Sequence, residues 1–207
     1  MSDWTLITGT GRSGTSCFAK LMNACFPDRP MPGADYWNEN VNAGCEGNLS
    51  ALLENPNLAL PPGVIVKDPR AEDLLRLVNI GCIPSFVFVC FRPLHLSAES
   101  RMSNQMKYFG PIQHTIGVDY QSRIMQGLEH ELRGTSKLQY LNDHVAVGMI
   151  MDTIWQHNIP HAILKYPDFV TDAETLYEQV NAALPIDKDV FMEKHAEIMD
   201  PSLVHKK

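Results

Sequence analysis

Residues 6–16 read Leu6-Ile7-Thr8-Gly9-Thr10-Gly11-Arg12-Ser13-Gly14-Thr15-Ser16. An apolar strand pattern runs here into a glycine-rich turn, and the turn leads directly into a helical pattern. Such a turn directs successive backbone N–H groups into one concavity at a helix N-terminus, a geometry that binds phosphate or sulfate. The hydroxyl groups of Thr15 and Ser16 and the guanidinium of Arg12 add donors suited to a tetrahedral oxyanion. The stretch therefore predicts an anion cradle after the first strand.

Alternating strand and helix patterns extend from this cradle along the chain. Short apolar runs rich in β-branched or aromatic residues predict buried strands at Trp4–Thr8, Val64–Lys67, Phe86–Phe91 and Ala162–Tyr166. Helical patterns follow them at Thr15–Cys25, at Ala71–Ile80, from near Leu94, and at Asp172–Leu184. This order predicts an α/β protein with a three-layer P-loop-type fold, in which helices flank a central, mainly parallel sheet.

Two long insertions interrupt the alternation within what the length of 207 residues predicts to be a single domain, residues 1–207. They cover about residues 26–62 and 108–158. The first is rich in proline and asparagine and carries one short helical candidate, Leu49–Glu54. The second predicts helices at Asp119–Arg133 and Ser136–His157. Long insertions in α/β folds usually build the substrate side of a site, so we expect the acceptor side here.

The composition narrows the class of protein. There are 17 basic and 24 acidic residues, a net charge of −7, which argues against a nucleic-acid binder held by charge. No apolar run approaches the roughly 20 residues of a membrane span, and the first apolar stretch lacks the pattern of a signal peptide. Five cysteines without a Cys-x-x-Cys pair favour reduced thiols that fill the core. We expect a cytoplasmic protein without a metal site, and oligomerisation is left open.

The cradle matches three kinds of phosphate-binding turn. Gly9-x-Gly11-x-x-Gly14 has the spacing of a dinucleotide fingerprint, but the proline-rich residues 26–32 cannot supply its second strand. The same glycines match a nucleoside-triphosphate P-loop, except that Thr15 replaces the lysine that reaches the β and γ phosphates. Asp68, which follows a predicted strand, keeps a P-loop kinase as an alternative.

The third match is the 5′-phosphosulfate loop. Arg12-Ser13-Gly14-Thr15-Ser16 resembles the corresponding signature of sulfotransferases that use 3′-phosphoadenosine 5′-phosphosulfate, and three further motifs follow in the family's order. Val64 to Arg70 resembles the Lys-Asp-Pro-Arg segment of bacterial and tyrosylprotein-type members. Phe88 to Ser100 resembles the 3′-phosphate motif, although Arg92-Pro93 is one residue shorter than the usual Arg-Asp-Pro. Leu164 to Asp172 resembles the late strand that ends in Tyr-Glu-Asp-Leu.

The resemblance implies a sulfotransferase with this nucleotide as donor co-substrate and no required metal. The glycine turn would hold the 5′-phosphosulfate through Gly11, Arg12, Ser13, Gly14, Thr15 and Ser16. Arg92 and Ser100 would bind the 3′-phosphate, and Tyr166 would lie near the adenine. Lys67 would stabilise the bridging oxygen, with Arg12 as a second catalytic cation. The acceptor would be a small molecule, a glycan or a peptide. A non-catalytic nucleotide-binding protein of the same fold is the other alternative.

A general base for the acceptor proton is the remaining requirement. The first insertion contains Asp35, Glu39 and Glu46 after the cradle. Glu46 is favoured, because its surroundings resemble the Asn-rich segment of bacterial members. Asp35 lies near the position where tyrosylprotein-type members place their glutamate, so it is the second candidate. His95, just after Arg92, is the next residue to consider.

Overall fold

The computed structural model describes residues 3–10, 12–33, 37–38, 43–44, 49, 60–69, 71–100 and 136–203. Its main sheet has four parallel strands, β1 (Trp4–Gly9), β4 (Val64–Lys67), β5 (Phe86–Phe91) and β6 (His161–Lys165). Their spatial order is β4-β1-β5-β6. The predicted α/β fold with a parallel sheet is confirmed. The fourth strand lies one residue earlier than predicted, so Tyr166 follows it.

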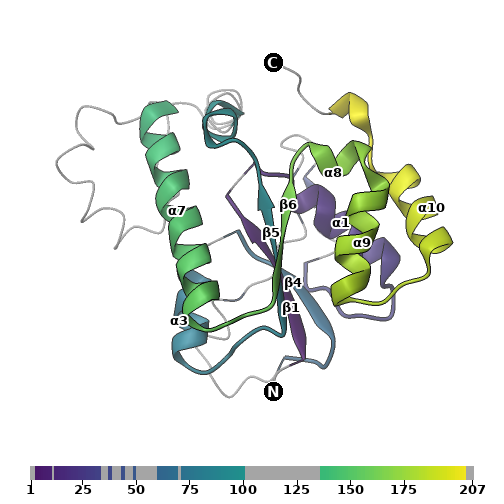
Figure 1. The fold of residues 1–207 in the computed structure, drawn as a ribbon, viewed down its shortest axis with the longest axis horizontal. Helices are drawn as coiled ribbons and strands as arrows, with labels where there is room; N and C mark the ends of the chain where they lie inside the picture. The colour runs from purple at the N-terminus through teal and green to yellow at the C-terminus, as the bar shows by residue number, and fades with distance from the viewer. Residues whose placement is uncertain are drawn as a thin grey trace.

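Helices cover both faces of this sheet (Figure 1). One layer contains α1 (Thr15–Cys25), the short α8 (Asp168–Thr171), α9 (Ala173–Ala183) and α10 (Lys188–Ile198). The other layer contains α3 (Ala71–Asn79) and α7 (Ser136–Gln156), which pack against each other. Residues 94–100 are helical as well. The remaining described elements are an antiparallel pair, β2 (Trp37–Asn38) and β3 (Ala43–Gly44), and a terminal 3₁₀ turn, η1 (Pro201–Leu203).

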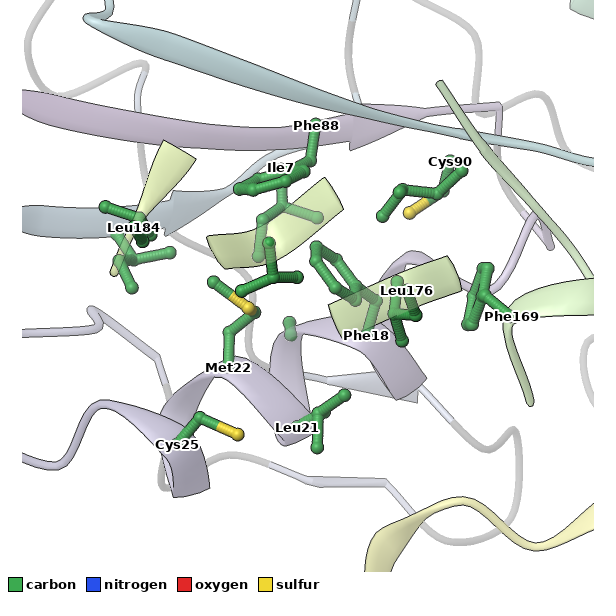
Figure 2. Close-up of a cluster of buried hydrophobic side chains, with 14 of the residues drawn as sticks. Ile7, Phe18, Leu21, Met22, Cys25, Phe88, Cys90, Phe169, Leu176 and Leu184 are labelled. Carbon is green, nitrogen blue, oxygen red and sulfur yellow. The ribbon is translucent and has the colours of Figure 1, made fainter. Parts of the chain in front are cut away.

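The strands are apolar on both faces because both faces are covered. Side chains alternate along β1, so Ile7 belongs to the core beneath α1, whereas Leu6 belongs to the core beneath α3 and α7. In the first of these cores, Phe18 of α1 lies between two other rings (Figure 2). Its centroid is 5.2 Å from that of Phe88 and 6.0 Å from that of Phe169. Edge-on aromatic contacts of this kind fix α1 against β5 and α8.

The two central strands end side by side and then diverge. Gly9 pairs with Cys90, so β1 and β5 end at the same level. The connection that leaves β1 runs through α1 on one face, whereas the connection that leaves β5 returns through α7 on the other face. This divergence is the topological switch point at which open α/β sheets bind ligands. We therefore expect a ligand site at the residues that follow Gly9 and Phe91.

The helix α7 belongs to the covering layer of the sheet. Ile150, Met151 and Ile154 are buried against α3 and the sheet. Trp155, which follows Ile154, is 65% exposed. Within the described part of the chain, none of the helices has the length and apolar character needed to traverse a bilayer.

Candidate anion-binding site

The N-terminus of α1 lies at the switch point, and the first turn of this helix contains no acidic residue. Gly14 is the N-cap residue, in the left-handed region at φ 86°. In contrast, Asp172 caps α9 and Asp187 caps α10, each accepting hydrogen bonds from the first-turn N–H groups. The first N–H groups of a helix have no partner within it and carry partial positive charge. The start of α1 is therefore suited to an external anion.

The turn before α1 is held by internal hydrogen bonds. Both the N–H and the hydroxyl of Ser13 donate to the carbonyl oxygen of Thr10, and Ser13 is fully buried. The Ser13 side chain therefore stabilises the turn, and its predicted contact with a ligand remains a prediction. Arg12 is also in the left-handed region, at φ 70°, and its Nε donates to Ser100 Oγ over 3.4 Å. A non-glycine residue at positive φ is often found where function requires it.

Lys67 brings a buried positive charge to the same place. It is the last residue of β4 and is only 1% exposed. Its ammonium Nζ donates to the hydroxyl of Ser16, in the first turn of α1, over 2.9 Å. Burying an ammonium group is costly unless the charge is paired or hydrogen-bonded. As predicted, Lys67 lies close to the cradle. Lys67 ends β4, whereas the cradle follows β1.

A second cation lies at the end of β5. Arg92 follows Phe91 directly and is 7% exposed. Its guanidinium carbon lies 5.5 Å from the centroid of the Tyr166 ring, a cation–π geometry. Burial raises the pKa of Tyr166 and the nearby Arg92 charge lowers it, with burial the larger effect. The Tyr166 hydroxyl is therefore neutral at physiological pH.

Several buried polar atoms in the segments that follow β1 and β5 have no hydrogen-bond partner among the described residues. They are Thr10 Oγ1 after β1, and Arg92 Nε and Ser97 Oγ after β5. Leaving a buried donor or acceptor unpaired costs about 1–3 kcal/mol, so such atoms often indicate a missing ligand or water. Thr10 and Ser97 were not predicted, because a single hydroxyl residue carries no signal in the sequence.

The candidate bases are only partly described. Asp35 and Glu46, together with Gly11 of the turn, lie outside the described residues. His95 lies on the helical segment 94–100 and is exposed.

Six of the predicted site residues lie around the start of α1, with Thr15 buried in its first turn. These six residues are Arg12, Ser16, Lys67, Arg92, Ser100 and Tyr166.

The described cysteines are not poised as nucleophiles. Burial raises the pKa of Cys17 and of Cys25 to about 11, and it raises the pKa of Cys90 further still. A thiol with a raised pKa stays protonated at neutral pH and is unreactive. Cys25 and Cys90 are part of the core around α1, as the sequence predicted.

Gly14 is the most sensitive position of the turn. A Cβ there would lie 2.5 Å from Cδ2 of Tyr166 and 2.8 Å from Cζ of Phe169, in addition to the left-handed φ. We expect Gly14→Ala to lower the free energy of unfolding by about 2–5 kcal/mol, of which about 1–2 kcal/mol is backbone strain. Denaturant unfolding measures this loss.

Gly81 provides the matched control for this substitution. Its φ is +81°, close to that of Gly14, but a Cβ there would meet no atom within 4 Å. Gly81→Ala should therefore lose only the backbone contribution, about 1–2 kcal/mol. Equal losses in the two variants would mean that the two aromatic rings do not press on Gly14.

The geometry of the site is the basis on which a function is inferred for this chain. Among the residues that the structure describes, no three His, Cys, Asp or Glu side chains are grouped as metal ligands. Comparison of the chain with models of known protein families, with curated proteins and with solved structures finds no match.

Proposed function

We propose that this protein is a sulfotransferase that moves a sulfuryl group from 3′-phosphoadenosine 5′-phosphosulfate to a hydroxyl or amine of a small molecule, glycan or peptide. The observation that carries the proposal is the buried Lys67 ammonium, bonded to Ser16 at the start of α1. A buried cation beside a helix whose first turn holds no acidic residue is suited to a group that carries negative charge and gains more during the reaction.

The positions of the other cations support a donor with two anionic ends. Arg12 and Lys67 approach the start of α1, whereas Arg92 follows the neighbouring strand β5. A 5′-phosphosulfate would be held by the turn and Arg12, with Lys67 beside the bridging oxygen. A 3′-phosphate would be held by Arg92, with Ser100 of the following helical segment 94–100, whose hydroxyl accepts from Arg12. Each charge-assisted hydrogen bond contributes about 1.5–3 kcal/mol.

The reaction breaks the bond between sulfur and the bridging phosphate oxygen and forms a bond between sulfur and the acceptor oxygen or nitrogen. The bridging oxygen leaves with the 5′-phosphate and gains negative charge, which Lys67 would offset. The acceptor loses a proton to a carboxylate, for which Glu46 is the first candidate and Asp35 the second. The protein would position these groups and supply the charge.

Transfer of labelled sulfate tests the proposal. The protein is incubated with donor labelled in the sulfuryl group and with panels of phenols, amines, sugars and peptides, and incorporation of label is measured. Label in an acceptor supports the sulfotransferase. Tight nucleotide binding without transfer would favour the non-catalytic alternative. Phosphate transfer from ATP with magnesium would favour a P-loop kinase.

Glu46→Gln is expected to lower the rate of transfer by about 10²–10⁴-fold, because an amide cannot accept the acceptor proton. Its affinity for the desulfated nucleotide should stay that of the wild type. Glu54→Gln, in the predicted helix Leu49–Glu54, is the control and should keep the wild-type rate. If Glu46→Gln is fully active, Asp35→Asn is the next variant, and activity of both would exclude a carboxylate base at these positions and leave His95.

A further inference from the structure

The ring of Tyr166 lies between the two cationic parts of the site. On one side it contacts the turn, since a Cβ on Gly14 would be 2.5 Å from its Cδ2 and 3.0 Å from its Cγ. On the other side the guanidinium carbon of Arg92 lies 5.5 Å from the ring centroid. One side chain therefore touches both the N-cap of α1 and the cation that follows β5.

The ring is held in this position by its surroundings. The backbone N–H of Tyr166 donates to the carbonyl oxygen of Phe91, over 2.6 Å, which ties its backbone to the end of β5. The ring packs edge-on against Phe169, with centroids 5.6 Å apart. Phe169 is fixed in turn, because the Nε2 of the buried His195 in α10 lies 2.9 Å from its carbonyl oxygen. The covering layer of α8 and α10 thus limits the movement of the Tyr166 ring.

We infer that Tyr166 is a positioning residue that sets the spacing between the anion site at Gly14 and the anion site at Arg92, and thereby selects nucleotides phosphorylated at both the 5′ and 3′ positions. This inference rests on the proposed function. A ring packed against Gly14 keeps the Arg92 guanidinium at a fixed separation from the helix N-terminus. A ligand with both anionic groups gains from that separation, whereas a ligand with one group does not. This role differs from the predicted contact of Tyr166 with the adenine.

The experiment compares two nucleotides, 3′-phosphoadenosine 5′-phosphate and adenosine 5′-phosphate, by titration calorimetry. The readout is the ratio of their dissociation constants, since a merely structural change would weaken both ligands alike. The wild type should prefer the bisphosphate by about ten- to a hundredfold. Tyr166→Leu should reduce this preference by about three- to thirtyfold, because it removes the cation–π contact and the spacer. Tyr166→Phe keeps the ring and should keep the preference.

Tyr177 offers a matched control in α9. It is also half-buried, its ring packs 5.6 Å from that of Phe191, and Lys188 Nζ lies 5.7 Å from its centroid. Tyr177→Leu therefore removes a comparable ring and cation–π contact away from the site, and the preference should remain that of the wild type. An unchanged preference in Tyr166→Leu, or an equal loss for both nucleotides, would overturn the inference.

Two further outcomes are a variant that does not fold and a wild type that binds neither nucleotide. If Tyr166→Leu does not fold, Tyr166→Met replaces it, because methionine also lacks the ring and its cation–π contact but fills the space with a more adaptable side chain. The inference expects a reduced preference in that variant, and an unchanged preference would overturn it. A wild-type protein that binds neither nucleotide would overturn both the inference and the proposed function. If the wild type prefers the bisphosphate and the variants keep that preference, the inference alone is overturned.

Discussion

Lys67→Met is expected to lower the turnover of sulfuryl transfer by about 10²–10³-fold, while the affinity for 3′-phosphoadenosine 5′-phosphate changes by less than about tenfold. Methionine approximates the length of the lysine side chain and has no charge, so the variant removes the ammonium that donates to Ser16 at the start of α1. An interaction that strengthens as the bridging oxygen gains charge contributes chiefly to the transition state. Single-turnover kinetics and nucleotide titration separate the two quantities.

Lys165→Met is the matched control for this variant. Lys165 ends the strand β6 as Lys67 ends β4, but it is exposed to solvent. Its substitution should change neither turnover nor affinity. Wild-type turnover in Lys67→Met would show that the buried ammonium has only a structural role, and equal losses in both variants would show that the effect is not specific to the cradle.

Arg92→Met is expected to weaken the binding of 3′-phosphoadenosine 5′-phosphate by about ten- to a hundredfold. The arginine is buried, its Nε has no hydrogen-bond partner among the described residues, and it lies against the Tyr166 ring. Removing it should lose the charge-assisted contacts to the 3′-phosphate. The rate of transfer at saturating donor should fall less than the affinity, because this group is remote from the sulfur.

Arg76→Met controls for the loss of one positive charge from the chain. Arg76 lies in the last turn of α3, and its side chain is exposed. Its removal should leave nucleotide affinity unchanged. If Arg92→Met binds the bisphosphate as tightly as the wild type does, the assignment of the 3′-phosphate to Arg92 is wrong. If Arg76→Met is weakened equally, long-range charge explains the effect.

The sequence predicted the sheet well because each strand is buried on both faces. The four apolar runs correspond to β1, β4, β5 and β6 within one residue at either end. The predicted helices that follow β1 and β4 are also present, as α1 and α3. In contrast, the spatial order β4-β1-β5-β6 comes from the connections and cannot be read from the runs themselves.

The sequence did not lead us to predict helix α10 or the contact that its His195 makes with Phe169. Asp187 precedes this helix and accepts hydrogen bonds from its first turn, and the buried Phe191 and His195 follow at helical spacing. This cap and spacing could have indicated the helix. The contact of His195 with the carbonyl oxygen of Phe169 joins residues 26 positions apart, and no local pattern predicts such a contact.

The candidate site was predicted in part. Strand ends and a glycine turn are local signals, so Arg12, Lys67 and Arg92 could be identified from their positions in the chain. The packing of the Tyr166 ring on Gly14 depends on how β6 and α8 return to the turn. The hydrogen bond from the Ser13 hydroxyl to Thr10 could not be predicted either, because a serine in such a loop can face either the ligand or the backbone.

Thermal unfolding with 3′-phosphoadenosine 5′-phosphate, ATP with magnesium, and NAD shows which nucleotide the site binds. A ligand at 100 times its dissociation constant stabilises the folded state by about 2.7 kcal/mol. For a chain of this size the unfolding midpoint should rise by roughly 5–10 °C. We expect this rise with the bisphosphate and a much smaller one with the other two nucleotides. A shift with ATP and magnesium or with NAD, and none with the bisphosphate, would contradict this expectation.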